Sequence, residues 1–155
     1  MDLGAAPGGW MQISRNIVGK TGFVLGVDLK VIEPFIESNV RSVVGDLAKP
    51  ETVEIIRKLL PRPADVVISD ASPNISGIWE VDHARQIDLA RSSLRIALSV
   101  LEGEGNFFVK AFQGDMLNDF AKEMRNYFSC VRFVKPKASR RKSAELFIVS
   151  LKKLG

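Results

Sequence analysis

The sequence predicts a doubly wound α/β domain built on a mainly parallel sheet. Its 155 residues fit one domain, and 46% of them are hydrophobic, enough for a sizeable core. Short apolar segments alternate with segments of helical periodicity, which is typical of strands joined by helical crossovers. The last two apolar segments are separated only by Lys135–Ser143, too few residues for a helical crossover, so they should form an antiparallel hairpin.

Six strands are expected from the apolar, β-branched segments. Several of these segments are apolar throughout, as strands buried on both faces tend to be. The segments are Gly22–Val27, Arg41–Val44, Ala64–Ser69, Asn106–Phe112, Val131–Val134 and Leu146–Leu151.

A further strand should end within Met1–Gly4, directly before a glycine-rich loop. The first strand of a doubly wound sheet is central, and strands usually run about five or six residues. The first strand is therefore expected to be truncated here, and a preceding segment is expected in a longer natural protein.

Four helices are expected between the strands. In the third, Ile87, Ala90, Leu94 and Leu98 recur at three- and four-residue spacing and form one apolar face. The helices are Gly9–Val18, Pro50–Leu60, His83–Leu101 and Gly114–Phe128.

The composition excludes several classes of protein. No apolar run approaches the roughly 20 residues that a membrane span needs, and no signal peptide pattern opens the chain. The single Cys130 cannot form an internal disulfide, and Cys130 with the single His83 cannot make a zinc site, so no metal is expected. Both residues are expected to be structural, with Cys130 in the core. A cytoplasmic monomer without membrane contact is expected.

Positive charge gathers near the end of the chain. Eight basic residues and one acid, Glu145, lie between Arg132 and Gly155, although the whole chain has a net charge of only +4. Such a segment is either a solvated tail or the electrostatic footprint of a nucleic-acid binder.

The glycine-rich loop Asp2–Trp10 (DLGAAPGGW) lies where the first strand gives way to the first helix. Glycines allow positive φ and close approach of a ligand, and the helix N-terminus offers free N–H groups. The loop matches neither the dinucleotide pattern GxGxxG nor a P-loop. It is interpreted as a ligand site, with a tight turn of no function as the alternative.

Two acids end the strands that follow this loop. Asp28 lies where an acid reaches the ribose hydroxyls of a bound nucleoside, although it could instead cap a turn. Asp46, in a Gly-Asp turn, could accept a hydrogen bond from an adenine amino group. The strand ends therefore predict a nucleoside-shaped site.

These motifs, with SDASPN (69–74), VKAFQG (109–114) and SRRKSAELFIV (139–149), resemble the FtsJ/RrmJ family over essentially the whole chain. That family contains S-adenosylmethionine-dependent RNA 2′-O-ribose methyltransferases. The resemblance implies a Rossmann-like methyltransferase fold with seven strands, S-adenosylmethionine as cofactor (S-adenosylhomocysteine as product), and RNA as partner, expected to be large-subunit ribosomal RNA or the ribosomal particle.

The resemblance also implies site residues. The last three members of the family's catalytic Lys-Asp-Lys-Glu tetrad match Asp70, Lys110 and Glu145, whereas the first lysine lies upstream of the glycine-rich strand and is not in this sequence. The expected cofactor-binding residues are Gly4, Gly8, Gly9, Trp10, Asp28, Asp46 and Asp70.

Removal of a ribose hydroxyl proton would fall to Lys110, which accepts a proton only when neutral. The two acids are expected to orient it. Trp10 could pack under the first helix or against the cofactor, and Trp79, in the polar loop Ile75–Asp82, could be a base-stacking platform or a core plug.

Lysine and arginine supply sequence-independent phosphate contacts to nucleic acids. The expected RNA-binding residues are Lys135, Lys137, Arg140, Arg141 and Lys142. Three alternatives remain: a transfer RNA methyltransferase of the same family, a non-catalytic RNA-binding protein that keeps the fold, and, least favoured, an NAD-dependent oxidoreductase.

Overall fold

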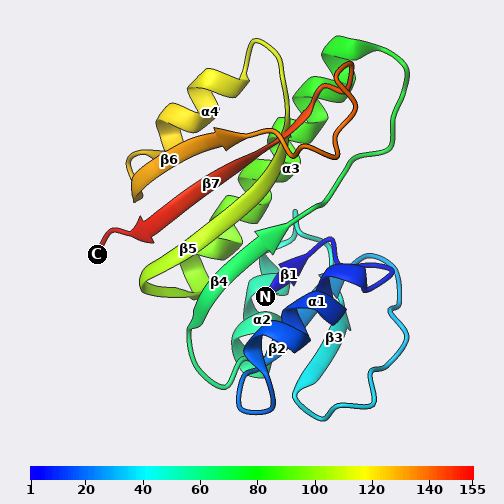
Figure 1. Cartoon of the computed structure of the whole chain (residues 1–155), viewed down its shortest axis with the longest axis vertical. Helices are drawn as coiled ribbons and strands as arrows, with labels where there is room; N and C mark the ends of the chain where they lie inside the picture. The colour runs from blue at the N-terminus through cyan, green and yellow to red at the C-terminus, as the bar shows by residue number, and fades with distance from the viewer.

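The computed structural model describes residues 1–155 and contains one seven-stranded sheet (Figure 1). The strand order is β3-β2-β1-β4-β5-β7-β6, parallel except for β7, which is antiparallel to both of its neighbours. The predicted α/β class and the antiparallel hairpin at the end of the chain are confirmed. The strands are β1 (Asp2–Leu3), β2 (Val24–Asp28), β3 (Val40–Val44), β4 (Ala64–Ser69), β5 (Leu101–Phe112), β6 (Phe128–Val134) and β7 (Glu145–Lys153).

Helices lie on both faces of the sheet. In Figure 1, α1 lies in front of the strands and α3 behind them, and α3 contacts both α2 and α4. No helix is both long and apolar enough to cross a membrane. The helices are α1 (Gly9–Val18), α2 (Pro50–Leu59), α3 (Trp79–Val100) and α4 (Leu117–Met124).

Two apolar clusters hold the helices to the sheet. The larger one joins strand residues such as Phe107 to Ile56 of α2, Ile87 of α3 and Phe120 of α4. The smaller one places Met11 of α1 against β2 and the glycine-rich loop. Because the parallel strands share one direction, the loops that follow β1, β2, β3 and β4 all emerge at one edge of the sheet, the carboxyl edge.

Several boundaries and one burial differ from the sequence prediction; β6, for example, begins at Phe128 and not at Val131. Helix α3 begins at Trp79 and not at His83, because acids in its first turn favour a helix N-terminus. Helix α4 is shorter than expected at both ends: the Met116 N–H ahead of it donates to His83 Nε2, and Phe128 already belongs to β6. Strand β5 begins at Leu101, which pairs with β4 across a register shift. Cys130 is only half-buried, because β6 is the edge strand.

Candidate functional site

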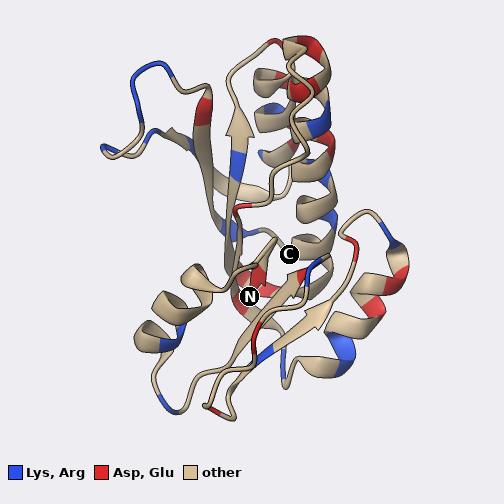
Figure 2. Cartoon of the chain, turned by 90° about the vertical axis from the view of Figure 1, so that its right-hand side faces the viewer, with Lys and Arg blue, Asp and Glu red and all other residues tan.

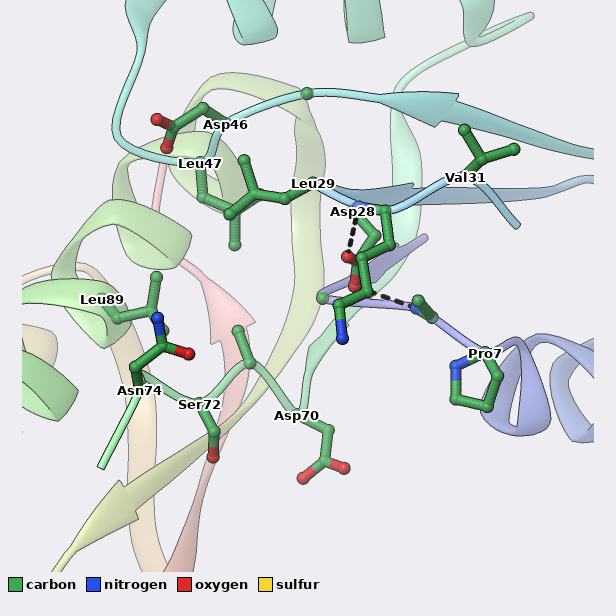
Figure 3. A pocket seen from close by; sticks show the side chains of 15 residues that line it. Pro7, Asp28, Leu29, Val31, Asp46, Leu47, Asp70, Ser72, Asn74 and Leu89 are labelled. Atoms are coloured by element: carbon green, nitrogen blue, oxygen red, sulfur yellow. Dashed lines mark hydrogen bonds between the residues drawn. The ribbon is translucent and has the colours of Figure 1, made fainter. Parts of the chain in front are cut away.

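A cavity of about 510 Å³ opens at the carboxyl edge of the sheet (Figure 3). This volume lies within the range of small-molecule sites, roughly 300–1,000 Å³. Its walls come from the glycine-rich loop, from the ends of β2, β3 and β4, and from α3. The lining residues are Gly4, Ala6, Pro7, Asp28, Leu29, Lys30, Val31, Gly45, Asp46, Leu47, Asp70, Ala71, Ser72, Asn74 and Leu89.

The glycine-rich loop approaches the chain after β4 closely. Gly4 has φ +74°, and a Cβ there would lie 2.7 Å from the Ala71 backbone. Gly8, with φ +118°, caps α1 without any side-chain hydrogen bond to the first-turn N–H groups. Any side chain at Gly4 would therefore push the loop away from one wall of the cavity.

The predicted cofactor residues of this loop divide into two groups. Gly4 lines the cavity, whereas Gly8, Gly9 and Trp10 do not. The Trp10 ring packs against Phe108 and Phe147, with ring centroids 5.9 and 5.8 Å away. In this structure, therefore, Trp10 in the first turn of α1 packs against aromatic side chains of β5 and β7.

Asp28 and Asp46 both line the cavity, as the strand ends predict. The Ala6 N–H donates to Asp28 Oδ2 at 3.0 Å and the Lys30 N–H donates to Asp28 Oδ1 at 2.8 Å (Figure 3). Each carboxylate oxygen can accept a further hydrogen bond, so Asp28 is held in place and still able to bind a ligand. Asp46 is held similarly by the Ala48 N–H, 2.9 Å from Oδ1.

Lys110 lies at the centre of a polar cluster near the end of β5. Its side chain is only 10% exposed, and its Nζ lies 2.8 Å from Asp70 Oδ1 and 3.5 Å from Glu145 Oε1. Nζ also donates to Ser72 Oγ at 3.3 Å. The structure thus brings together the three residues that match the family's tetrad.

Asp70 and Ser72 connect this cluster to the cavity, because both contact Lys110 and both line the cavity wall. Buried Gln86 of α3 supports the connection: its Nε2 donates to the backbone oxygens of Ala71 and Lys110, each at 3.1 Å. A ligand in the cavity would therefore lie next to a nearly buried amine.

Asp2 is a buried acid at the base of the site. It is 1% exposed, and neither carboxylate oxygen has a hydrogen-bond partner. Burial is the main reason why its pKa rises to about 7; the Met1 ammonium opposes the rise, and the charges of Asp70 and Asp28 add to it.

The predicted RNA-binding residues follow β6 in an exposed connection, residues 135–144, called here the basic loop. Figure 2 shows it projecting from the body of the protein, with most of its ribbon in the colour of lysine and arginine. The Lys135 ammonium donates to the Ser143 backbone oxygen and closes the loop at its base. The loop leads directly into Glu145 of the polar cluster.

Two supporting residues could not be assigned roles from the sequence. In the sequence, Asp2 is recognisable only as a residue of the first strand, and nothing near it along the chain predicts that its carboxylate is buried. Gln86 is a polar residue among the apolar positions of a helix, and this is the only feature of the sequence that could have indicated a role for it. Ser72 belongs to a quoted motif, but its contact with Lys110 depends on the fold.

Comparison with known sequences gives consistent matches. The sequence profile of the family described as FtsJ-like methyltransferase matches residues 1–153. "Ribosomal RNA large subunit methyltransferase E" of Methanocaldococcus jannaschii is 49% identical over 100% of this chain and 64% of its own length. The protein of the same name from Methanothrix thermoacetophila is 53% identical over 99% of this chain and 59% of its own. The chain thus spans about three fifths of the length of these relatives.

Solved structures share the fold. A Plasmodium falciparum protein, provisionally named a ribosomal RNA methyltransferase, superposes with a TM-score of 0.88 at 23% identity, over 99% of this chain and 85% of its own. A fibrillarin/Nop5p complex gives a TM-score of 0.66 at 17% identity, over 97% of this chain and 70% of the other. At these identities the similarity establishes the fold alone.

Proposed function

The chain belongs to the FtsJ-like methyltransferase family, and we propose from this premise that it methylates a ribose 2′-hydroxyl of RNA with S-adenosylmethionine. The observation that carries the proposal is that Asp70 both lines the cavity and contacts Lys110. A cofactor in the cavity and a hydroxyl at the amine would meet at this residue. Positioning alone can supply much of the rate of such a transfer.

The cavity fits the proposed cofactor. S-adenosylmethionine, when bound, supplies a methyl group on a positively charged sulfonium. Asp28, with both oxygens already oriented by backbone N–H groups, suits the two ribose hydroxyls of the cofactor. In this proposal Asp46, which lines the cavity, accepts a hydrogen bond from the adenine amino group, and the carboxylates around the cavity favour a cation. Gly4 lets the ligand approach the backbone.

In this proposal Lys110 handles the proton of the target hydroxyl. Asp70, Glu145 and Ser72 fix the position of Nζ at one end of the cavity. A neutral Lys110 amine would accept the proton of the 2′-hydroxyl, and the two carboxylates would stabilise the ammonium that forms. Asp70 and Glu145 are thus orienting residues, and Lys110 is the base.

RNA is the proposed partner, and large-subunit ribosomal RNA is the favoured substrate because the relatives quoted above carry that name. A transfer RNA anticodon loop is the alternative within the family. The test is incubation with labelled cofactor and either ribosomal RNA or transfer RNA, followed by nucleoside analysis. A 2′-O-methylated nucleoside from ribosomal RNA is expected. RNA binding without methylation would instead support a non-catalytic binding protein.

Replacing Asp28 with alanine should weaken binding of S-adenosylhomocysteine by about 1.5–3 kcal/mol, because hydrogen bonds to a charged group are lost. Calorimetry measures the change. Asp88→Ala, at an exposed acid of α3, is the matched control and should bind as the wild type does. Tighter binding of NAD than of S-adenosylhomocysteine by the wild type would contradict the cofactor proposal.

Charge reversal at Arg140, Arg141 and Lys142 should weaken RNA binding and make it less dependent on salt, because fewer counterions are then released. Affinity for S-adenosylhomocysteine should stay unchanged. The matched control reverses three exposed lysines elsewhere, at positions 20, 58 and 122. Equal RNA affinity in the two triple variants would show that the basic loop is only a solvated surface.

A further inference from the structure

Trp79 is a large aromatic side chain that the fold leaves exposed at the start of α3. Trp79 is 45% exposed. Its ring stacks on His83, with centroids 5.9 Å apart and planes 16° apart, and on Phe112, at 6.1 Å and 22°. Two rings of the protein thus contact the indole, while nearly half of the residue faces solvent.

The support under Trp79 is rigid. His83 is buried, its Nε2 accepts the Met116 N–H, and its ring occupies the space where a Cβ on Gly114 would lie, 2.6 Å from the imidazole. The loop before α3 is held as well, because Asp82 accepts hydrogen bonds from the N–H groups of Ser76 and Gly77 and from Ser76 Oγ. These donors hold the pKa of Asp82 below its ordinary value. The indole is therefore preorganised.

Trp79, with the rings of His83 and Phe112 that contact it, lies between the two proposed binding regions, the cavity and the basic loop. Phe112, beneath Trp79, follows Lys110 by two residues on β5 and pairs with Glu145. The Gln113 N–H donates to the Ala144 oxygen, at the base of the basic loop. The segment that precedes α3 begins at the cavity wall. Figure 1 shows the start of α3 at the same end of the molecule as the β6–β7 connection.

We propose that Trp79 stacks an unpaired nucleobase next to the nucleotide that is methylated. This inference rests on the proposed function and adds a positioning residue to it. Single-stranded RNA is bound by aromatic side chains that stack on bases, together with cationic groups that follow the phosphates. Trp79 supplies the first element and the neighbouring basic loop the second. The exposed side chains of Ile75 and Ile78 extend the apolar surface on which a base would rest.

The charge of this region decides the occupant. An apolar surface alone would suit a protein partner equally well. Here the surface adjoins a loop with five exposed basic residues, so a ligand that carries both flat apolar rings and regularly spaced negative charge matches it. Nucleic acid combines the two in every nucleotide.

The test compares Trp79→Ala and Trp79→Phe with the wild type. With ribosomal RNA as substrate, Trp79→Ala should raise KM for RNA about 5- to 150-fold, the effect of losing one stacked base. Binding of S-adenosylhomocysteine and the thermal unfolding temperature should change little. Trp79→Phe keeps a ring and should recover most of the affinity.

A binding experiment separates stacking from charge. The probes are an oligouridylate of about twelve nucleotides and an abasic oligomer of the same length with the same phosphates. The oligouridylate should quench the part of the tryptophan fluorescence that is lost in Trp79→Phe, and the abasic oligomer should not. The abasic oligomer should bind the wild type and Trp79→Ala equally.

The outcomes distinguish the two proposals. If the wild type methylates RNA and Trp79→Ala has an unchanged KM, the stacking role is wrong and the enzyme proposal stands. If the wild type methylates no RNA but the oligouridylate still quenches Trp79, the enzyme proposal fails and the stacking surface stands. Stabilisation of the fold as the only role of Trp79 would appear as a lower unfolding temperature with equal RNA affinity.

Discussion

Replacing Lys110 with methionine is expected to lower the single-turnover rate of ribose methylation by about 10²- to 10⁴-fold, the usual contribution of a positioned general base. Methionine keeps most of the side-chain volume on β5 and removes only the amine. The three contacts of Nζ, with Asp70, Glu145 and Ser72, are lost together. The measurement follows label transfer from the cofactor to ribosomal RNA at saturating enzyme.

The controls distinguish chemistry from binding. Lys110→Met should bind S-adenosylhomocysteine within a few-fold of the wild type, because Asp28 and Asp46 remain in the cavity. Lys122→Met, at an exposed position of α4, should methylate as the wild type does. A rate for Lys110→Met within a few-fold of the wild type would mean that proton removal needs no amine, and that positioning by the two carboxylates suffices.

Much of the fold could be predicted because its signals are local and repeated. The apolar runs form the strands β2, β4 and β7, of which β2 is buried over nearly its whole length. The three- and four-residue spacing in α3 marks the face that packs on β5. The first residues of the strands and helices could be predicted less well than the elements themselves. The early start of β5 depends on pairing with β4, and the late start of α4 depends on a hydrogen bond to His83, and neither partner is near in sequence.

The sequence predicts the part of the site whose position is determined by the sheet. Parallel strands deliver their carboxyl ends to one edge, so Asp28, Asp46 and Asp70 had to gather there. The direction of a side chain within a loop or a first helical turn has no such rule. Trp10 therefore turns to Phe108 and Phe147 beside α1, and its role in cofactor binding stays a prediction.

Contacts between distant segments are the part that the sequence could not provide. The Nε2 donor of Gln86 reaches the backbone oxygens of Ala71, after β4, and of Lys110, on β5, and this arrangement exists only after α3 has packed. Asp2 is similar, because its burial comes from the elements that surround it and not from its neighbours along the chain. That burial has a consequence for stability.

Replacing Asp2 with asparagine should remove a pH dependence of folding between about pH 4 and pH 7. A pKa raised from 3.8 to about 7 means that the folded state holds a proton that the unfolded chain releases. The free energy of unfolding therefore falls as pH rises through this window, by about 4 kcal/mol in total. The Met1 ammonium, whose pKa is lowered to about 6 by burial, acts with the opposite sign between about pH 6 and pH 8.

Urea unfolding of the wild type and Asp2→Asn at pH 5 and pH 8 tests this expectation. Both proteins keep Met1, so their difference reports on Asp2: between pH 5 and pH 8 the wild type should lose about 3 kcal/mol of stability relative to the variant. Asp115→Asn, at an exposed acid, should follow the wild type at both values. Parallel pH curves for the wild type and Asp2→Asn would mean that the buried carboxylate is satisfied by groups or waters around it. Asp2 would then be a polar support of the glycine-rich loop and not a source of instability beneath it.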